Sequence, residues 1–264
     1  MGIPSHEPDA SMPPSENALS VLLGRLGPGS PQIGFTVLAH SEPEFGWRRC
    51  AATLDRRVML EALPRVLIRS RCSLSRRLRA YLDEKGFAVR LESFDPVRHG
   101  RELGRRIPKN SVPIFEQGDG LVLWDSRIII EYVEDHAPPP ALMPKDAECR
   151  ARLRLLYDLT DVALEPLVRA FAEASGKKRR KKADEIIETV RTIVPHLSHD
   201  GPYAIGKRFS VADLSVPPVL LTAIEDGLDP SRLPIRVRLW LQTVLDRPSM
   251  RKLFPKVRLT ARAA

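Results

Sequence analysis

The sequence predicts a mixed α/β domain followed by an all-helical domain, behind an N-terminal segment without regular structure. Three observations support this fold class: strand-like apolar runs between residues 66 and 124, helical periodicity after residue 146, and proline-rich sequence before the first domain and between the two domains. Of the 264 residues, 43% are hydrophobic, which is enough for a substantial core or for two small domains that share an interface.

Residues 1–58 are predicted to be a disordered, Pro/Ser-rich extension. Their short apolar pieces show no sustained period, and residues 1–17 lack the basic start and apolar core of a secretory signal. Met59 could also serve as a translation start. No stretch approaches the ~20 apolar residues needed to cross a bilayer. Together with three widely spaced cysteines, which fit a reducing compartment, this predicts a cytoplasmic protein.

Residues 59–137 are expected to form the α/β domain. The run 66–68 is typical of a buried strand, and 75–85 has apolar side chains at helical spacing before Gly86. Strands are also predicted at 87–94, 111–115 and 121–124, and a helix at 127–134. The resulting order, strand–helix–strand and then strand–strand–helix, is that of a thioredoxin-like domain.

Residues 138–145 are predicted to be a stiff linker, and residues 146–264 a helical domain. Long amphipathic stretches cover 147–174 and 182–197, and shorter helices are predicted at 235–245 and from Pro248 onward.

Residues 210–213 (SVAD) have the pattern of a capping box, in which the side chains of Ser210 and Asp213 each accept a backbone amide at a helix start. Pro217 and Pro218 follow soon after, so this helix is expected to be kinked.

Four segments resemble the glutathione-transferase superfamily. Residues 72–77 (CSLSRR) match its active-site turn, and 111–113 (SVP) match a segment whose proline is cis in the family. Residues 125–126 (DS) match the pair that opens its third helix, and 209–213 (FSVAD) its capping box. The resemblance spans about residues 60 to 255. It implies a thioredoxin-like N-terminal domain plus an all-α C-terminal domain, and a homodimer.

Other segments resemble one branch of this superfamily, the stringent starvation protein A family: 123–132 (LWDSRIIIEY), 142–144 (LMP) and 202–206 (PYAIG). This resemblance implies a transcription regulator that binds RNA polymerase holoenzyme and uses the fold as a scaffold without transferase activity. The family carries a Pro-His-Pro surface loop in that role. Here the matching residues are Pro138, Pro139 and Pro140, so Pro139 replaces the histidine and places the polymerase contact in question.

A glutathione-dependent enzyme is the alternative. Cys72 would lie at the start of a helix, where unpaired amides and the helix dipole favour an anion, and Arg71, Arg76 and Arg77 would add positive potential. Such a thiol could form a mixed disulfide with glutathione, or Ser73 could orient a glutathione thiolate. The structural alternative is that Cys72 is a small residue packed at a turn.

In this alternative, the resemblance assigns glutathione binding to Val112, Pro113, Asp125 and Ser126. A cis Pro113 would expose the Val112 backbone to the cysteinyl part, and the Ser126 hydroxyl would hold the γ-glutamyl carboxylate together with helix amides. The same residues also have purely structural roles, because Asp125 or Ser126 can cap a helix. Glutathione would be a co-substrate, and no cofactor or metal site is predicted.

The formal net charge is +9, which favours acidic partners. Much of the excess comes from one basic run. No aromatic residue is interleaved, so the run could contact nucleic-acid phosphates but not stack on bases, and such runs are usually a solvated face. The run consists of Lys177, Lys178, Arg179, Arg180, Lys181 and Lys182.

Overall fold

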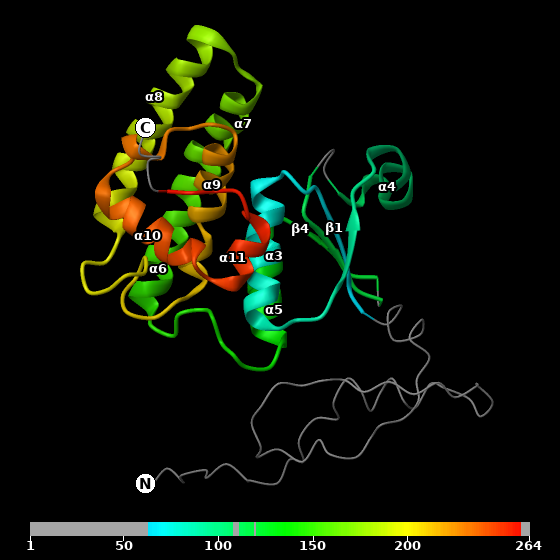
Figure 1. Cartoon of the computed structure of the whole chain (residues 1–264). Helices are drawn as coiled ribbons and strands as arrows, with labels where there is room; N and C mark the ends of the chain where they lie inside the picture. The colour runs from blue at the N-terminus through cyan, green and yellow to red at the C-terminus, as the bar shows by residue number, and fades with distance from the viewer. Residues whose placement is uncertain (1–62, 108–110, 119, 260–264) are drawn as a thin grey trace, which may run out of the picture. The chain divides into compact units, whose positions relative to one another are not determined.

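The computed structural model describes residues 63–107, 111–118 and 120–259. All of them belong to the second of the two units into which the chain divides, residues 61–264. The disorder predicted for residues 1–58 lies outside the described residues. The described chain forms a small sheet flanked by helices, followed by a helical half (Figure 1).

The α/β half contains a four-stranded mixed sheet with strand order β2-β1-β3-β4. Strand β1 (Arg65–Ile68) pairs in parallel with β2 (Arg90–Ser93) and antiparallel with β3 (Ile114–Glu116). Strand β3 pairs antiparallel with β4 (Val122–Trp124). The parallel pair needs a crossover, which helix α3 (Ser73–Lys85) supplies. The thioredoxin-like order predicted from the sequence is confirmed.

The strands are shorter than predicted where backbone pairing ends. Pro113 has no amide to donate, so β3 begins at Ile114 and not at residue 111. Strand β2 has four residues because β1 offers only four partners. The register places Phe115 between Val66 and Leu123, and both Phe115 and Val66 are completely buried. The sheet therefore contributes its centre to the hydrophobic core.

Helices α3 and α5 (Ser126–His136) cover one side of the sheet, and α4 (Pro96–Leu103) lies on the other side (Figure 1). Gly86 ends α3 with a φ of 66°, as its position predicts. Helix α4 was not predicted, since Gly100 and several charged residues interrupt its short apolar pattern. Its start is specified locally, because the Asp95 carboxylate accepts from the amide of Val97 at 2.8 Å.

Within its described residues, the second half consists of helices and connecting loops and contains no strand, in keeping with the prediction. The elements are α6 (Ala147–Asp158), a π-helical segment (Leu159–Leu164), α7 (Glu165–Glu173), α8 (Gly176–Ile193), 3₁₀ turns at Val194–His196, Val211–Leu214 and Pro230–Arg232, α9 (Pro217–Glu225), α10 (Ile235–Leu245) and α11 (Pro248–Leu253).

Three predicted helices differ from the observed ones. The stretch 147–174 is interrupted by the π-helical segment, because Pro166 has no amide for the carbonyl of Val162. The stretch 182–197 begins earlier, at Gly176, since lysine and arginine are good helix formers. The helix expected to be kinked at Pro217 is instead two elements, a 3₁₀ turn and then α9, which starts at that proline.

The capping box is confirmed. The Ser210 hydroxyl accepts from the Ala212 amide at 3.3 Å, and the Asp213 carboxylate accepts from the Ser210 amide at 2.9 Å. The other Asp213 oxygen accepts from the Ala204 amide at 2.7 Å and from Trp240 Nε1 at 2.8 Å. Asp213 and Trp240 are both completely buried, so one carboxylate joins the turn, the preceding loop and α10.

Helix α3 lies between the sheet and the helical half and contacts both α9 and α11 (Figure 1). One hydrophobic cluster includes residues of both halves. At the C-terminal end of α3, the Glu84 carboxylate accepts from Arg247 Nε at 2.8 Å and from the Ser249 hydroxyl at 2.5 Å. The two halves are thus joined by apolar packing and by charged hydrogen bonds, and the cavity described next is formed by both.

Candidate functional site

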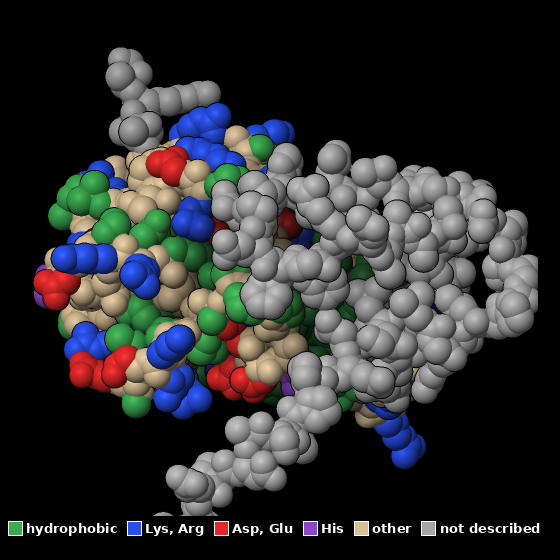
Figure 2. Space-filling view, turned by 90° about the horizontal axis from the view of Figure 1, so that it is seen from below, with side chains coloured by type: hydrophobic (Ala, Val, Ile, Leu, Met, Phe, Trp, Pro, Cys, Tyr) green, Lys and Arg blue, Asp and Glu red, His purple; other side chains and the backbone are tan. Residues whose placement is uncertain are grey.

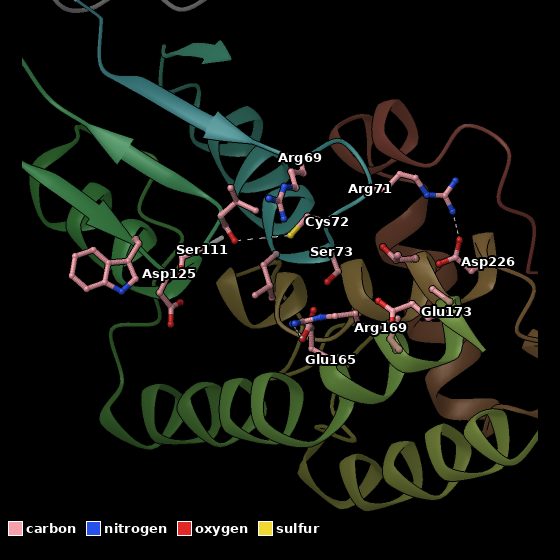
Figure 3. A pocket seen from close by; sticks show the side chains of 16 residues that line it. Arg69, Arg71, Cys72, Ser73, Ser111, Asp125, Glu165, Arg169, Glu173 and Asp226 are labelled. Carbon is pink, nitrogen blue, oxygen red and sulfur yellow. Dashed lines mark hydrogen bonds and ion pairs between the residues drawn. The ribbon is translucent and has the colours of Figure 1, made fainter. Parts of the chain in front are cut away.

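A cavity of about 790 Å³ lies where the start of α3, the loop before β3 and the start of α5 face α7 and the end of α9 (Figure 3). Its lining is mixed, with a thiol, backbone groups, an indole and charges of both signs. The lining includes Arg69, Arg71, Cys72, Ser73, Leu74, Ser111, Val112, Trp124, Asp125, Glu165, Val168, Arg169, Ala172, Glu173, Thr222 and Asp226.

Cys72 occupies the N-cap position of α3 and lines this cavity. Its own amide donates to the Arg69 carbonyl at 3.1 Å, and its carbonyl accepts from the Arg76 amide at 3.0 Å. The thiol makes no capping hydrogen bond and lies 4.0 Å from the Val112 carbonyl oxygen. Ser73 also lines the cavity, although it is only 5% exposed. Of the two candidate nucleophiles, the half-buried Cys72 thiol is therefore the more accessible from the cavity.

The Val112–Pro113 peptide bond is cis, as the resemblance implied. Val112 lines the cavity, and its carbonyl oxygen accepts from the Cys72 thiol at 4.0 Å, whereas Pro113 is buried. The turn thus brings backbone groups of residues 111 and 112 to the thiol, the arrangement that an extended peptide-like ligand would need to pair with.

The fold places the neighbouring residues Asp125 and Ser126 in different environments. Asp125 lines the cavity with a φ of 72°, an uncommon conformation for a residue other than glycine. Burial alone would raise the pKa of Asp125, but hydrogen bonds from the Arg127 side chain and amide outweigh it and hold this pKa below its ordinary value. Ser126 is completely buried, and its hydroxyl accepts from Arg77 Nη1 at 3.3 Å.

The two arginines of α3 that were expected to lend positive potential to Cys72, Arg76 and Arg77, are both paired with acidic side chains. Arg76 is buried against α9, where it forms an ion pair with Glu225 at 2.7 Å. Arg77 is completely buried and donates to both Asp161 oxygens, at 3.0 and 2.6 Å. The helical periodicity of residues 75–85 cannot reveal these ion pairs, because the acidic partners come from segments distant in the sequence.

The charges that do line the cavity are largely paired with one another. Arg71 forms an ion pair with Asp226 across the cavity mouth (Figure 3). Arg169 on α7 donates to Glu165 at 2.6 Å, and this hydrogen bond raises the pKa of Arg169. Trp124 at the end of β4 is 39% exposed. The sequence analysis missed Trp124, Glu165 and Arg169; the i,i+4 spacing of the last two was the available signal.

A second hollow, of about 540 Å³, lies beside the three consecutive prolines. Pro138, Pro139 and Pro140 are all exposed, and the Pro139–Pro140 bond is cis. The hollow is lined by Ala141, Leu142, Met143, Pro144, Lys145, Asp146, Cys149, Ile205, Lys207, Arg208, Phe209 and Ser210. We call it the proline-side groove.

The predicted basic run occupies the first two turns of α8, directly after the short link from α7. Within the described ranges, no group of three or more His, Cys, Asp or Glu side chains could hold a metal ion. None of the helices in the described part of the chain is long and apolar enough to cross a membrane.

Comparison with known proteins agrees with the fold. Residues 67–141 match the family model for the glutathione S-transferase N-terminal domain. The chain is 30% identical to a stringent starvation protein A homolog from Pasteurella multocida over 152 residues, 58% of this chain and 71% of that protein. It is 31% identical to a probable maleylacetoacetate isomerase from Caenorhabditis elegans over 151 residues, 54% of this chain and 69% of that protein.

Among solved structures, the crystal structure of maleylacetoacetate isomerase from Anaeromyxobacter dehalogenans with bound glutathione superposes with a TM-score of 0.60 at 24% identity, covering 74% of this chain and 96% of that one. Glutathione transferase Omega 3C from Trametes versicolor superposes with a TM-score of 0.60 at 22% identity, covering 72% and 88%. These likenesses concern the fold alone. From the sequence relatives, the family-model match and the fold together, the chain belongs to the glutathione S-transferase superfamily, with a resemblance to stringent starvation protein A.

Proposed function

We propose that this chain is a regulator that binds RNA polymerase holoenzyme, resembling stringent starvation protein A, and that the proline-side groove is its contact surface. The observation that carries the proposal is the groove itself, an apolar hollow whose cations have no ion-pair partner among the described residues, next in sequence to the exposed prolines that replace the family's Pro-His-Pro loop.

The wall of the groove is held in place by buried polar contacts. Lys85 donates to the Pro140 carbonyl at 2.8 Å and lies 3.3 Å from the Glu134 carboxylate. Glu134 accepts in turn from the amides of Leu142 and Met143, at 3.1 and 3.0 Å. The proline segment and the groove wall therefore share one anchor on α3 and α5, and a partner would meet a preorganised surface.

The chemistry of the groove favours an acidic segment with an apolar anchor. Half-buried Met143 and Phe209 offer apolar surface. The side chains of Lys145, Lys207 and Arg208 are exposed and make no ion pair within the described residues. Cations at the edge of an apolar hollow steer an acidic partner and speed its association.

A non-catalytic role is supported by the position of Ser126. The hydroxyl that would hold the γ-glutamyl carboxylate of glutathione is completely buried and accepts from Arg77. Arg77 also pairs with Asp161, so the hydroxyl belongs to a buried polar network, and opening that network to admit a ligand carboxylate would break a buried ion pair.

The test is co-elution of the full chain with purified polymerase holoenzyme at low salt. The variant K207E/R208E should weaken binding at least about tenfold, since it reverses two charges at the groove. The matched control R101E/R105E reverses two exposed charges, on α4 and on the 3₁₀ turn that follows it, and should bind like the wild type. If the wild type does not co-elute, or if both variants weaken binding equally, the proposal is wrong.

A glutathione-dependent thiol transferase is the second candidate, because the Cys72 thiol and the Val112 backbone face one cavity. The Cys72 thiolate would attack the glutathione sulfur of a mixed disulfide, forming a disulfide with glutathione and releasing the substrate thiol. A second glutathione would then regenerate Cys72 and leave as glutathione disulfide. Calorimetry with millimolar glutathione, on the wild type and on Cys72→Ser, separates the candidates: no heat of binding to the wild type removes this one.

We also expect a homodimer from the family resemblance, which light scattering of the full chain checks. A monomeric mass would contradict that expectation.

A further inference from the structure

The basic run at the start of α8 has an unusual position for structural cations. Helix N-termini carry a partial positive charge, so lysine and arginine are unfavourable in the first turns and acidic residues are favourable. Here the first turn of α8 has no acidic residue, and Ser175 at the N-cap makes no side-chain capping hydrogen bond. Cationic side chains and uncapped amides are thus concentrated at the same end of one helix.

Two of the six cations serve the fold. Arg179 donates to the carbonyl of Phe171 at 2.9 Å and also to that of Asp226, and its guanidinium lies 3.9 Å from the Phe171 ring. Lys182 donates to Glu185 at 2.6 Å. Arg179 thereby fixes the start of α8 against the end of α7 and the end of α9, so the run lies on a rigid support.

The other four cations, Lys177, Lys178, Arg180 and Lys181, are exposed. They make no ion pair within the described part of the chain, whereas acidic residues farther along α8 do have partners: Asp184 lies 2.6 Å from Arg232. We call these four residues the α8 cation cluster. Figure 1 places the start of α8 at one end of the helical half, where a large partner could approach it.

A hollow of about 320 Å³ adjoins the cluster, between the end of α7 and the start of α8. Its lining includes Lys178, Lys181 and Lys182, together with Glu173 and Glu185, of which Glu185 is paired with Lys182. Contacts to backbone phosphates need only clustered lysine and arginine side chains, and three lysines line this hollow.

The surroundings favour nucleic acid over lipid. Membrane-surface helices present large apolar side chains beside their cations, but none of the exposed large hydrophobic residues in the described chain lies between residues 174 and 190. The hollow also contains no aromatic residue for base stacking. On the face shown in Figure 2, Lys and Arg side chains lie beside Asp and Glu side chains.

We propose that the α8 cation cluster binds the phosphate backbone of double-stranded DNA without reading its sequence. With about three phosphate contacts, the logarithm of the association constant should fall with the logarithm of salt concentration with a slope of about −2.7, which is an affinity loss of about 40-fold between 50 and 200 mM salt.

The experiment is fluorescence anisotropy of the full chain with two 20-bp duplexes of unrelated sequence, across that salt range. The variant K177Q/K178Q/R180Q/K181Q keeps good helix formers and removes four charges; it should lose at least about tenfold in affinity at 50 mM salt, with a slope near zero. The control R101Q/R105Q/K252Q/K256Q removes four exposed charges elsewhere and should stay within about threefold of the wild type. Circular dichroism verifies that both variants are folded.

Three results would overturn the proposal: no binding of the wild type at 50 mM salt, equal losses in both variants, or a strong preference for one duplex. Vesicles containing phosphatidylserine are measured in parallel. Cluster-dependent binding to vesicles without binding to DNA would also overturn it, because the ligand would then be a lipid surface.

Discussion

Replacing Arg77 by methionine removes a buried cation that joins four segments of the protein. Arg77 is completely buried, and its two terminal nitrogens donate to Ser126 Oγ, to both Asp161 oxygens and, at 2.8 Å, to the Ser215 carbonyl. Methionine fills much of the same volume, so the lost free energy comes mainly from these contacts and not from a cavity.

The expected loss of unfolding free energy follows from the contacts that remain to the partners of Arg77 after the substitution. Asp161 keeps one partner, Arg127 at 3.2 Å, while the Ser126 hydroxyl and the Ser215 carbonyl lose a donor. Breaking one side of a buried ion pair typically destabilises a protein by about 3–5 kcal/mol. With a urea m-value of about 2 kcal/mol/M, the unfolding midpoint should fall by roughly 1.5–2.5 M.

Urea unfolding followed by circular dichroism measures this shift. Arg152→Met is the matched control, because Arg152 pairs with Glu148 on an exposed helix face and should contribute less than about 0.5 kcal/mol. The double variant R77M/D161L should recover part of the loss, since it removes both charges together. If Arg77→Met shifts the midpoint no more than Arg152→Met does, the assigned role of the network is wrong.

Three other predictions concern the fold. Asp213→Asn should destabilise the protein by about 2–4 kcal/mol, because an amide group cannot accept from all the donors around this carboxylate; the urea midpoint checks this, and a midpoint within error of the wild type would contradict it. Burial alone would raise the pKa of Glu84, but hydrogen bonds from Arg247 and Ser249 outweigh it and lower this pKa. The stability that Glu84 contributes is therefore present above its ordinary pKa and is lost as pH falls through the lowered one. The difference in unfolding free energy between the wild type and Glu84→Gln should accordingly shrink on acidification, and a constant difference would refute the sign. Gly201→Ala should cost about 1–3 kcal/mol, because the new Cβ would overlap the Gly206 carbonyl, whereas Gly118→Ala, which meets open space, should lower the thermal midpoint much less.

The sequence predicted those parts of the fold that local chemistry determines. Gly86 at the end of a helix, a capping box at residues 210–213 and a helical period over 235–245 each act within a few residues, and each prediction is confirmed. Helix α4 was not predicted because its apolar pattern is short, even though Asp95 and Pro96 are ordinary signals of a helix start.

The candidate site was predictable only in part, because its geometry depends on pairs distant in the sequence. The sequence placed Cys72 at a helix start and Val112 before a cis proline, and both line one cavity. It could not show that Arg77 is drawn to Asp161, 84 positions away, and thereby covers Ser126. Nor could it show the proline-side groove, whose walls come from two segments about 60 residues apart.

Affinity capture by the full chain from a lysate of its native host, with bound proteins identified by mass spectrometry, tests the central claim most directly. The account predicts RNA polymerase subunits in stoichiometric amounts with the wild type, and their loss with K207E/R208E. Absence of polymerase from the wild-type capture would contradict the regulator proposal, and glutathione-dependent chemistry at Cys72 would then be the function to pursue.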